Sequence, residues 1–205
     1  MRDSAEPIEQ QDDTDAHRVG TYALLGRVLA GAPDSDILTL IAHSDGGAME
    51  DVQDDLAAAW EELRSAAANA EPEALERQHH TLLVGVTHGL LIPYASWYLT
   101  GSLMEKPLVD LRSDLAALGI EREEGVSEPE DHAAALCDTM AWLIQDDEIG
   151  FETERRFFQE HLEPWIARFF EDMQDAEVAS PFYRTVGRLG SAFTAVESRY
   201  YAMEA

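Results

Sequence analysis

Apolar residues recur at every third or fourth position along most of this chain, with polar and charged residues between them. This spacing is typical of amphipathic helices, and Val52, Leu56, Trp60 and Leu63 form one clear run. We therefore expect an all-α fold, a single-domain helical bundle of about eight or nine helices. The pattern predicts helices at residues 16–30, 37–41, 49–70, 73–83, 108–118, 127–145, 151–161, 164–174 and from 181 onwards.

Two of the predicted helix ends carry recognisable signals. Gly119 follows the leucine stripe of residues 108–118 and stands where a C-terminal cap is expected. Ser127 is followed three residues later by Glu130, and Pro129 lies between them. This is the capping-box pattern, with a proline in the first turn, and it predicts that a helix begins there.

The chain begins with an acidic and polar segment. Residues 1–15 have no helical pattern, so we expect a mobile N-terminus there and one helical domain over residues 16–205. The segment lacks the basic start and apolar run of a secretory signal. The single cysteine, Cys137, excludes an intramolecular disulfide and a multi-cysteine zinc site. These features together indicate a cytoplasmic protein.

The charge balance is strongly acidic. Asp and Glu number 41 against 14 Lys and Arg, giving a formal net charge of -27, and Lys106 is the only lysine. The acids are spread along segments that also carry regular apolar positions, so we interpret them as a solvated face of a folded protein. Such a surface resembles those of proteins from salt-loving organisms. Free nucleic acid is excluded as a partner because phosphate binding needs clustered basic residues.

The stretch from Thr81 to Met104 carries no full charge apart from a possible proton on His88. Its length would suit a membrane span. Several glycines and Pro93 interrupt it, however, so we expect a buried or groove-lining loop and no stable membrane insertion.

Motifs for catalysis are missing from the sequence. There is no Gly-x-Ser-x-Gly elbow and no phosphate-binding loop, and Cys137 lies in a predicted helix without an identifiable base. His79 and His80 are adjacent on a helix and point about 100° apart, which disfavours a shared metal ion. We expect no catalytic residue, no metal and no cofactor, and therefore not an enzyme. A small helical enzyme or nucleotide-binding regulator remains a minor alternative.

Two segments carry unusual side chains. His132 shares a helix face with Leu136 and Met140, so its ring should point toward the core or a groove beside it. With Asp131 it is either a buried, hydrogen-bonded structural pair or a polar pair at the edge of an apolar groove. The segment Pro93–Leu99 contains three aromatic residues, which serve either core packing or the anchoring of an apolar peptide.

Four stretches follow one another in an order that is specific to one family. They are Leu82-Leu83-Val84-Gly85, Pro93-Tyr94-Ala95-Ser96-Trp97-Tyr98-Leu99, Glu128-Pro129-Glu130-Asp131-His132 followed by Met140-Ala141-Trp142-Leu143, and His161-Leu162-Glu163-Pro164-Trp165 followed by Pro181-Phe182-Tyr183. Together they span most of residues 75–185. The chain resembles the TorD/DmsD group of redox-enzyme maturation chaperones, to which NarJ-type chaperones are more distantly related.

The resemblance implies an all-helical, TorD-like fold and a cytoplasmic chaperone. Its partner would be the precursor of a molybdopterin-dependent oxidoreductase catalytic subunit of the dimethyl-sulfoxide-reductase type. The chaperone would bind the twin-arginine leader and the body of that subunit during cofactor insertion and before export, as a monomer or homodimer. The alternative is a NarJ-like assembly factor for a respiratory nitrate-type reductase subunit, without leader proofreading.

In the family, the aromatic loop and the Asp-His pair are associated with leader binding. Leu83 stands where the family more often has phenylalanine, and Tyr94 where some members have tryptophan, so the groove shape should differ. Carried over to this chain, the leader-binding residues are Leu83, Pro93, Tyr94, Ser96, Trp97, Tyr98, Glu128, Asp131 and His132.

The chemistry of a twin-arginine leader fits these residues. Two guanidinium groups followed by an apolar stretch need carboxylates beside an apolar trough. Asp131 and Glu128 suit the first, and Tyr94 and Trp97 the second, provided that the aromatic loop and the helix start meet in space. Because a first-turn position adds little core area, we expect Asp131→Ala or His132→Ala to weaken leader binding and to leave the fold intact.

Overall fold

The computed structural model describes residues 6–44, 54–85, 89–122 and 128–203, and within these ranges the side chains of all residues except 6–13 and 54. The described chain is built from helices and connecting segments, which confirms the all-α prediction. In chain order the elements are α1 (Glu6–Ala30), α2 (Ser35–His43), α3 (Asp54–Ala68), α4 (Pro72–His79), the π-helical turn η1 (His80–Val84), α5 (Ala95–Thr100), α6 (Lys106–Ala117), α7 (Ala133–Gln145), α8 (Phe151–His161), α9 (Ile166–Asp175) and α10 (Pro181–Met203).

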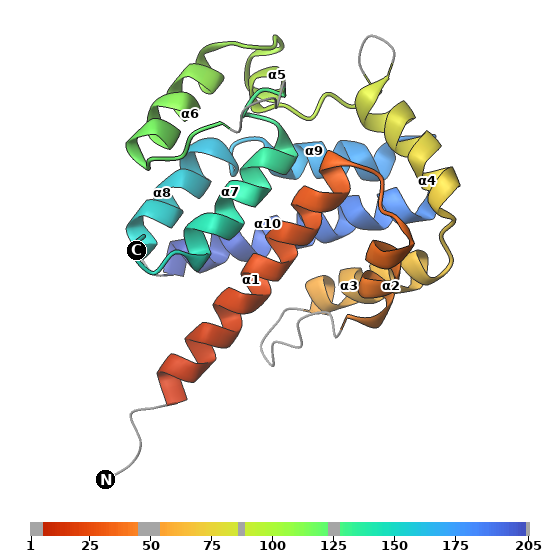
Figure 1. Cartoon of the computed structure of the whole chain (residues 1–205), viewed down its shortest axis with the longest axis horizontal. Helices are drawn as coiled ribbons and strands as arrows, with labels where there is room; N and C mark the ends of the chain where they lie inside the picture. Colours follow the sequence, from red (N-terminus) through yellow and green to blue (C-terminus); the bar gives the residue numbers. More distant parts are fainter. Residues whose placement is uncertain (1–5, 45–53, 86–88, 123–127, 204–205) are drawn as a thin grey trace.

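The helices form a bundle around the two longest helices, α1 and α10 (Figure 1). α1 packs along α7, and α10 packs against both α9 and α3, while α2 covers α3. α5 and α6 lie together at one edge of the bundle, beside the start of α7. None of the described helices combines the length and the apolar character that crossing a bilayer requires.

The contact between α9 and α10 illustrates how the core is built. α9 presents one fully buried stripe at helical spacing, which comprises Ile166, Phe169, Phe170 and Met173. α10 faces it with Gly187 and Gly190. A Cβ atom at either glycine would overlap Phe170, so the missing side chains are what allow the two helices to approach so closely.

Where helix boundaries depend on local chemistry, the prediction agrees with the structure. α8 has the predicted bounds, and α6 ends as expected before Gly119, which has a φ of 73°. The N–H of Ile120 donates to the carbonyl of Leu115 at 2.9 Å, which is the long bond of a Schellman cap.

One helix boundary near the N-terminus differs from the prediction, and another lies outside the described residues. α1 begins at Glu6, within the segment that we expected to be mobile, although residues 1–5 lie outside the described chain. The predicted start of the third helix at residue 49 also lies outside the described residues, and α3 is described from Asp54. The mobility of the N-terminus and the single domain over residues 16–205 stay predictions.

The predicted start of α7 at Ser127 is wrong. α7 begins at Ala133, and Ser127 itself lies outside the described residues. Glu130, the expected partner in the capping box, instead pairs with Arg112 of α6, with 2.8 Å between Nη2 and Oε2. The capping signal failed because the carboxylate has a tertiary partner that the local pattern does not reveal.

A buried ionic cluster joins three helices. Arg18 of α1 makes a bidentate pair with Glu197 of α10, with Nε–Oε1 and Nη2–Oε2 distances of 2.8 and 3.0 Å. The same guanidinium lies 3.4 Å from Glu154 of α8 and also donates to the hydroxyl of Tyr201. Tyr22 donates to Glu197 at 3.0 Å, so the carboxylate is held by two residues of α1. A buried charge pair is stable only while every member keeps its partners.

We expect Arg18→Ala to lower the free energy of unfolding by about 3–5 kcal/mol, because it leaves the buried Glu197 carboxylate without its counter-charge. Arg188→Ala is the matched control. Arg188 pairs with Glu62 at 2.6 Å on the surface, and removing an exposed pair should change stability by less than about 1 kcal/mol. Urea unfolding of both variants measures the two losses of stability. Equal losses would contradict a stabilising role for the buried Arg18–Glu197 pair.

Candidate functional site

Two segments far apart in the sequence meet at the start of α7. The N–H of Ala95 donates to the carbonyl of Asp131 at 2.9 Å, and the N–H of Ala133 donates to the carbonyl of Pro93 at 2.8 Å. The pair forms an isolated antiparallel bridge centred on Tyr94 and His132. The aromatic loop and the helix start therefore lie side by side, as the leader-binding hypothesis required.

Asp131 acts as a cap for α5. Tyr94, at the N-cap position, makes no side-chain capping bond. Instead Oδ2 of Asp131 accepts from the backbone N–H of Ser96 at 2.9 Å and from its hydroxyl. Asp131 is only 1% exposed, and its Oδ1 has no hydrogen-bond donor among the described residues. Oδ2 of Asp131 thus caps α5, and Oδ1 has no hydrogen-bond partner among the described residues.

His132 caps the next helix. Its Nδ1 accepts from the N–H of Ala134 at 3.1 Å, which satisfies one free donor at the start of α7. Burial lowers the pKa of His132 to about 4, although the charges of Glu128 and Asp131 oppose this shift. The ring is therefore neutral at pH 7. It packs edge-on against Tyr94, whose hydroxyl donates to the exposed carboxylate of Glu128.

A pocket of about 510 Å³ opens beside this bridge. Its walls are mostly apolar, three carboxylates border it, and no described lysine or arginine lines it. The lining residues are Ala30, Leu83, Val84, Gly89, Leu91, Ile92, Pro93, Tyr94, Leu103, Met104, Glu128, Pro129, Asp131, His132, Ala134, Ala135 and Asp138.

The π-helical turn η1 forms one wall of the pocket. Gly85 ends it with a φ of 64°, and its N–H reaches the carbonyl of His80. The chain then returns, and Leu91 donates to the carbonyl of Leu82 at 2.8 Å. π-Helical turns occur mostly as single turns and are frequent at functional sites. Here the turn directs Leu83 and Val84 toward the pocket.

The structure separates the nine predicted site residues into two groups. Leu83, Pro93, Tyr94, Glu128, Asp131 and His132 line the pocket. Ser96 is fully buried beneath it, and Trp97 is exposed on α5 outside the lining set. Tyr98 packs against Trp165 and donates to Asp172 at 2.8 Å, so it belongs to the contact between α5 and α9. Leader binding at all nine positions remains untested.

Sequence reasoning missed four notable lining residues. Val84, Leu103 and Met104 are apolar side chains that are 50%, 46% and 71% exposed, and Asp138 adds a carboxylate. Met104 also has a φ of 59°, which is unusual for a residue other than glycine. The uncharged character of residues 81–104 was the available signal for the apolar three. Asp138 stands seven residues after Asp131, and that spacing was its signal.

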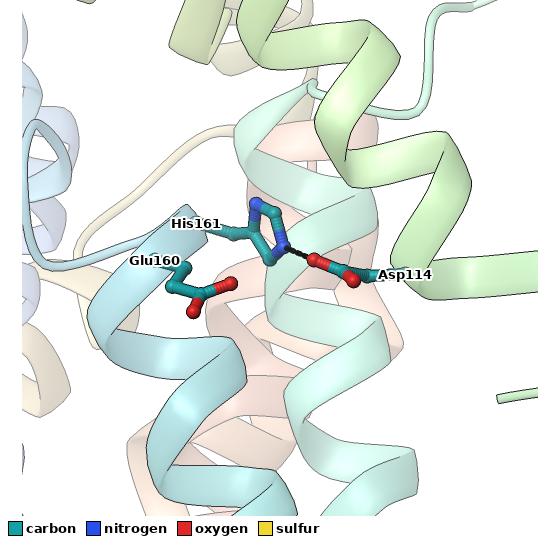
Figure 2. Close-up of side chains that lie close together, drawn as sticks. All are labelled: Asp114, Glu160 and His161. Atoms are coloured by element: carbon teal, nitrogen blue, oxygen red, sulfur yellow. Dashed lines mark hydrogen bonds and ion pairs between the residues drawn. The ribbon is translucent and has the colours of Figure 1, made fainter. Parts of the chain in front are cut away.

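A second group of polar side chains lies on the far side of α7 (Figure 2). Nε2 of His161 is 2.8 Å from Oδ2 of Asp114, which ties α8 to α6, and the carboxylate of Glu160 lies nearby. The indole N–H of Trp165 donates to the carbonyl of His161 at 2.8 Å. The His-Leu-x-Pro-Trp run therefore has a structural task at the end of α8. Asp114, Glu160 and His161 are the described group whose donor atoms are close enough to suit a metal ion, and the sequence analysis did not single them out.

We expect Asp131→Ala to lower the free energy of unfolding by about 1–3 kcal/mol, because it removes the acceptor for two buried donors of Ser96. This corrects the sequence-based expectation that Asp131→Ala would leave the fold intact. Asp131→Asn keeps an acceptor oxygen and should stay close to the parent. Urea unfolding compares the three proteins. An Asn variant as unstable as the Ala variant would show that charge, not hydrogen bonding, holds α5.

The lowered pKa of His132 makes stability depend on pH. Unfolded histidine titrates near pH 6.5 and folded His132 near pH 4, so the unfolded state binds more protons between these values. The parent should therefore lose stability as pH falls from 6.5 to 4, relative to His132→Asn, which still caps the helix but does not titrate. Urea unfolding at neutral and at mildly acidic pH measures the difference between the two proteins. A difference that is independent of pH would contradict the buried, neutral imidazole.

Residues 49–171 match the family described as nitrate reductase delta subunit. The chaperone protein TorD of Vibrio atlanticus is 30% identical over 128 residues, which are 57% of this chain and 59% of that protein. The Tat proofreading chaperone DmsD of Salmonella typhimurium is 37% identical over 79 residues, which are 38% of this chain and 37% of that protein. The matches with the Vibrio relatives thus span little more than half of their length. These names describe chaperones, in agreement with the expectation that the chain is not an enzyme.

A solved structure shares the fold of this chain. A redox enzyme maturation protein from Archaeoglobus fulgidus has a TM-score of 0.52 and 18% identity, covering 87% of this chain and 91% of its own. The identity is too low to say more than that the fold is shared. The family match over residues 49–171 and the curated relatives together show that the chain belongs to the TorD/DmsD family of redox-enzyme maturation chaperones.

Proposed function

We propose that the chain is a cytoplasmic chaperone that binds the twin-arginine leader and the body of a molybdopterin-dependent oxidoreductase catalytic subunit before export. The observation that carries the proposal is the pocket beside the Tyr94–His132 bridge, which combines apolar walls with carboxylates and has no described basic side chain in its lining. The names of the relatives support a chaperone and, for DmsD, a Tat proofreading chaperone.

The apolar part of a leader would cover the exposed wall. Val84, Leu103 and Met104 are large side chains that leave about half or more of their surface in water. Covering such a patch is favourable in proportion to the apolar area removed from water, at roughly 25 cal/mol per Å². An apolar leader segment can cover this patch without pre-formed secondary structure.

The arginines of the leader would meet the acidic side. Oδ1 of Asp131 is buried and lacks a donor, and Glu128 stays exposed while it accepts from Tyr94. Guanidinium groups make strong, often bidentate bonds with carboxylates. Because His132 is neutral at pH 7, it does not offset these negative charges. The pocket therefore favours a cationic group followed by an apolar one.

Salt should affect this interaction only modestly. At molar salt the screening length is about 3 Å, so long-range attraction by the acidic surface disappears. Contacts within the pocket are partly buried and are screened much less. If the protein works in concentrated salt, hydrogen bonds and apolar contact would carry the affinity.

A second candidate is a NarJ-like assembly factor for a respiratory nitrate-type reductase subunit. The observation that favours it is the family description, nitrate reductase delta subunit, over residues 49–171. Such a factor would hold the catalytic subunit without proofreading a leader. Calorimetry with the mature catalytic subunit and with its leader peptide, each alone, separates the two functions. Binding of the mature subunit alone would favour the assembly factor.

We expect a synthetic leader, with two adjacent arginines followed by an apolar stretch, to bind the parent protein in calorimetry at low and at high salt. Leu103→Glu should weaken binding at least about tenfold, because it places a charge where the apolar segment lies. Val109→Glu is the matched control, since Val109 is also exposed, at 62%, but lies outside the pocket. Failure of both leader and full precursor to bind would refute the proposal.

A further inference from the structure

Asp138 lies in the same pocket as Asp131 but was not among the predicted site residues. The two carboxylates are seven residues apart, with Ala135 between them, and all three residues line the pocket. Ala135 and Asp138 lie on α7, whereas Asp131 lies in the turn just before that helix. Asp138 and Glu128 are exposed, whereas Asp131 is only 1% exposed and borders the pocket beside Glu128, so a ligand meets the acidic side of the pocket at two places.

The carboxylate of Asp138 makes no hydrogen bond or ion pair with any described residue. It lies against α1 at Gly26, where a Cβ atom would overlap the carboxylate. Gly26 is thus the residue that makes room for Asp138 between the two helices. Asp138 stays exposed, but partial desolvation of its carboxylate beside α1 raises the pKa of Asp138. A carboxylate that is partly desolvated and unpaired gains most from a cation that enters beside it.

The neighbouring cations are engaged elsewhere. Arg27 follows Gly26 on α1, but its guanidinium lies 3.9 Å from Asp34 and donates to the carbonyl of Gly31. Arg112 and Arg122 both pair with Glu130, and Arg122 also donates to the backbone carbonyl of Glu128, so neither forms an ion pair with a carboxylate that lines the pocket. The counter-charge for the pocket must therefore come from the ligand, at least as far as the described residues are concerned.

We propose that Asp138 forms a second cation subsite, so that the pocket recognises two adjacent arginines, one at Asp131 and Glu128 and the other at Asp138. The inference rests on the proposed function and deepens it. Consecutive Cα atoms are 3.8 Å apart, and the long side chains of neighbouring residues in an extended segment diverge. A pair of arginines can therefore reach two separate carboxylates that line one pocket. A single metal ion cannot, because its ligands lie within about 2.6 Å of it.

Calorimetry with three synthetic peptides tests the second subsite. The first carries two adjacent arginines, a short spacer and an apolar stretch. In the other two, one arginine or the other is replaced by citrulline, which has the shape of arginine without its charge. We expect Asp138→Asn to weaken binding of the first peptide about tenfold. The loss should vanish with the peptide whose arginine at the Asp138 subsite is citrulline, and persist with the other.

Asp147→Asn is the matched control, because it makes the same change in net charge at an exposed position outside the pocket. It should bind all three peptides like the parent. Asp131→Asn should show the opposite peptide preference to Asp138→Asn. Thermal unfolding verifies that the variants are folded, and Asp138→Asn should be at least as stable as the parent, since its carboxylate has no described partner.

The possible results separate the two proposals. If the parent binds the two-arginine peptide and Asp138→Asn binds it equally well, the second subsite is wrong and the leader-binding function stands. An equal loss with all three peptides also overturns the second subsite, because it shows no coupling to one arginine. If the parent binds neither this peptide nor a full precursor, the proposed function fails, and the second subsite fails with it.

Discussion

Two backbone hydrogen bonds between residues 93–95 and residues 131–133 determine the geometry of the whole pocket. Both segments are short and irregular, and each would otherwise carry unpaired N–H and C=O groups beside the core. Pairing them aligns the aromatic loop with the first residues of α7. Because α7 packs along α1, the bridge also fixes where the loop lies relative to the centre of the bundle.

The consecutive residues Asp131 and His132 cap two different helices. The Asp131 carboxylate accepts from Ser96 at the start of α5, and the His132 ring accepts from Ala134 at the start of α7. The structural interpretation of this pair, as hydrogen-bonded side chains at a helix start, therefore describes real contacts. The pair also borders the pocket, so its side chains serve the fold and remain candidates for binding. A loss of binding after truncating Asp131 would have to be separated from loss of structure.

Carboxylates in the core and at the pocket differ in whether they have a cationic partner. Glu197 is almost completely buried, and Arg18 neutralises it with two hydrogen bonds. Asp131 and Asp138 border the pocket without a described cationic partner. Arg18, one of few basic residues in the chain, lies where an unpaired buried charge would destabilise the fold. Acidic groups that are left unpaired at a pocket are free to bind a cationic ligand, which is the basis of the proposals for this site.

The sequence by itself determined what depends on neighbours within one or two helical turns. Apolar periodicity predicted an all-α chain and the bounds of α8, and Gly119 marked the end of α6. Both signals are local, because helical periodicity and C-capping involve residues within one or two turns of each other. The quoted motifs also identified the family. They placed Tyr94 and His132 together in the site, but only through the resemblance.

Tertiary structure decided what depends on partners far along the chain. α5 has six residues, too few for a periodic signal, and its N-terminus is held by Asp131, 35 residues away from Ser96. α7 begins at Ala133 and not at the predicted Ser127 for the same reason, because Glu130 pairs with Arg112 of α6. Which side chains reach the pocket was likewise a question of packing. Asp138 faces it because Gly26 on α1 leaves space, and no pattern within α7 records the residue that lies opposite it.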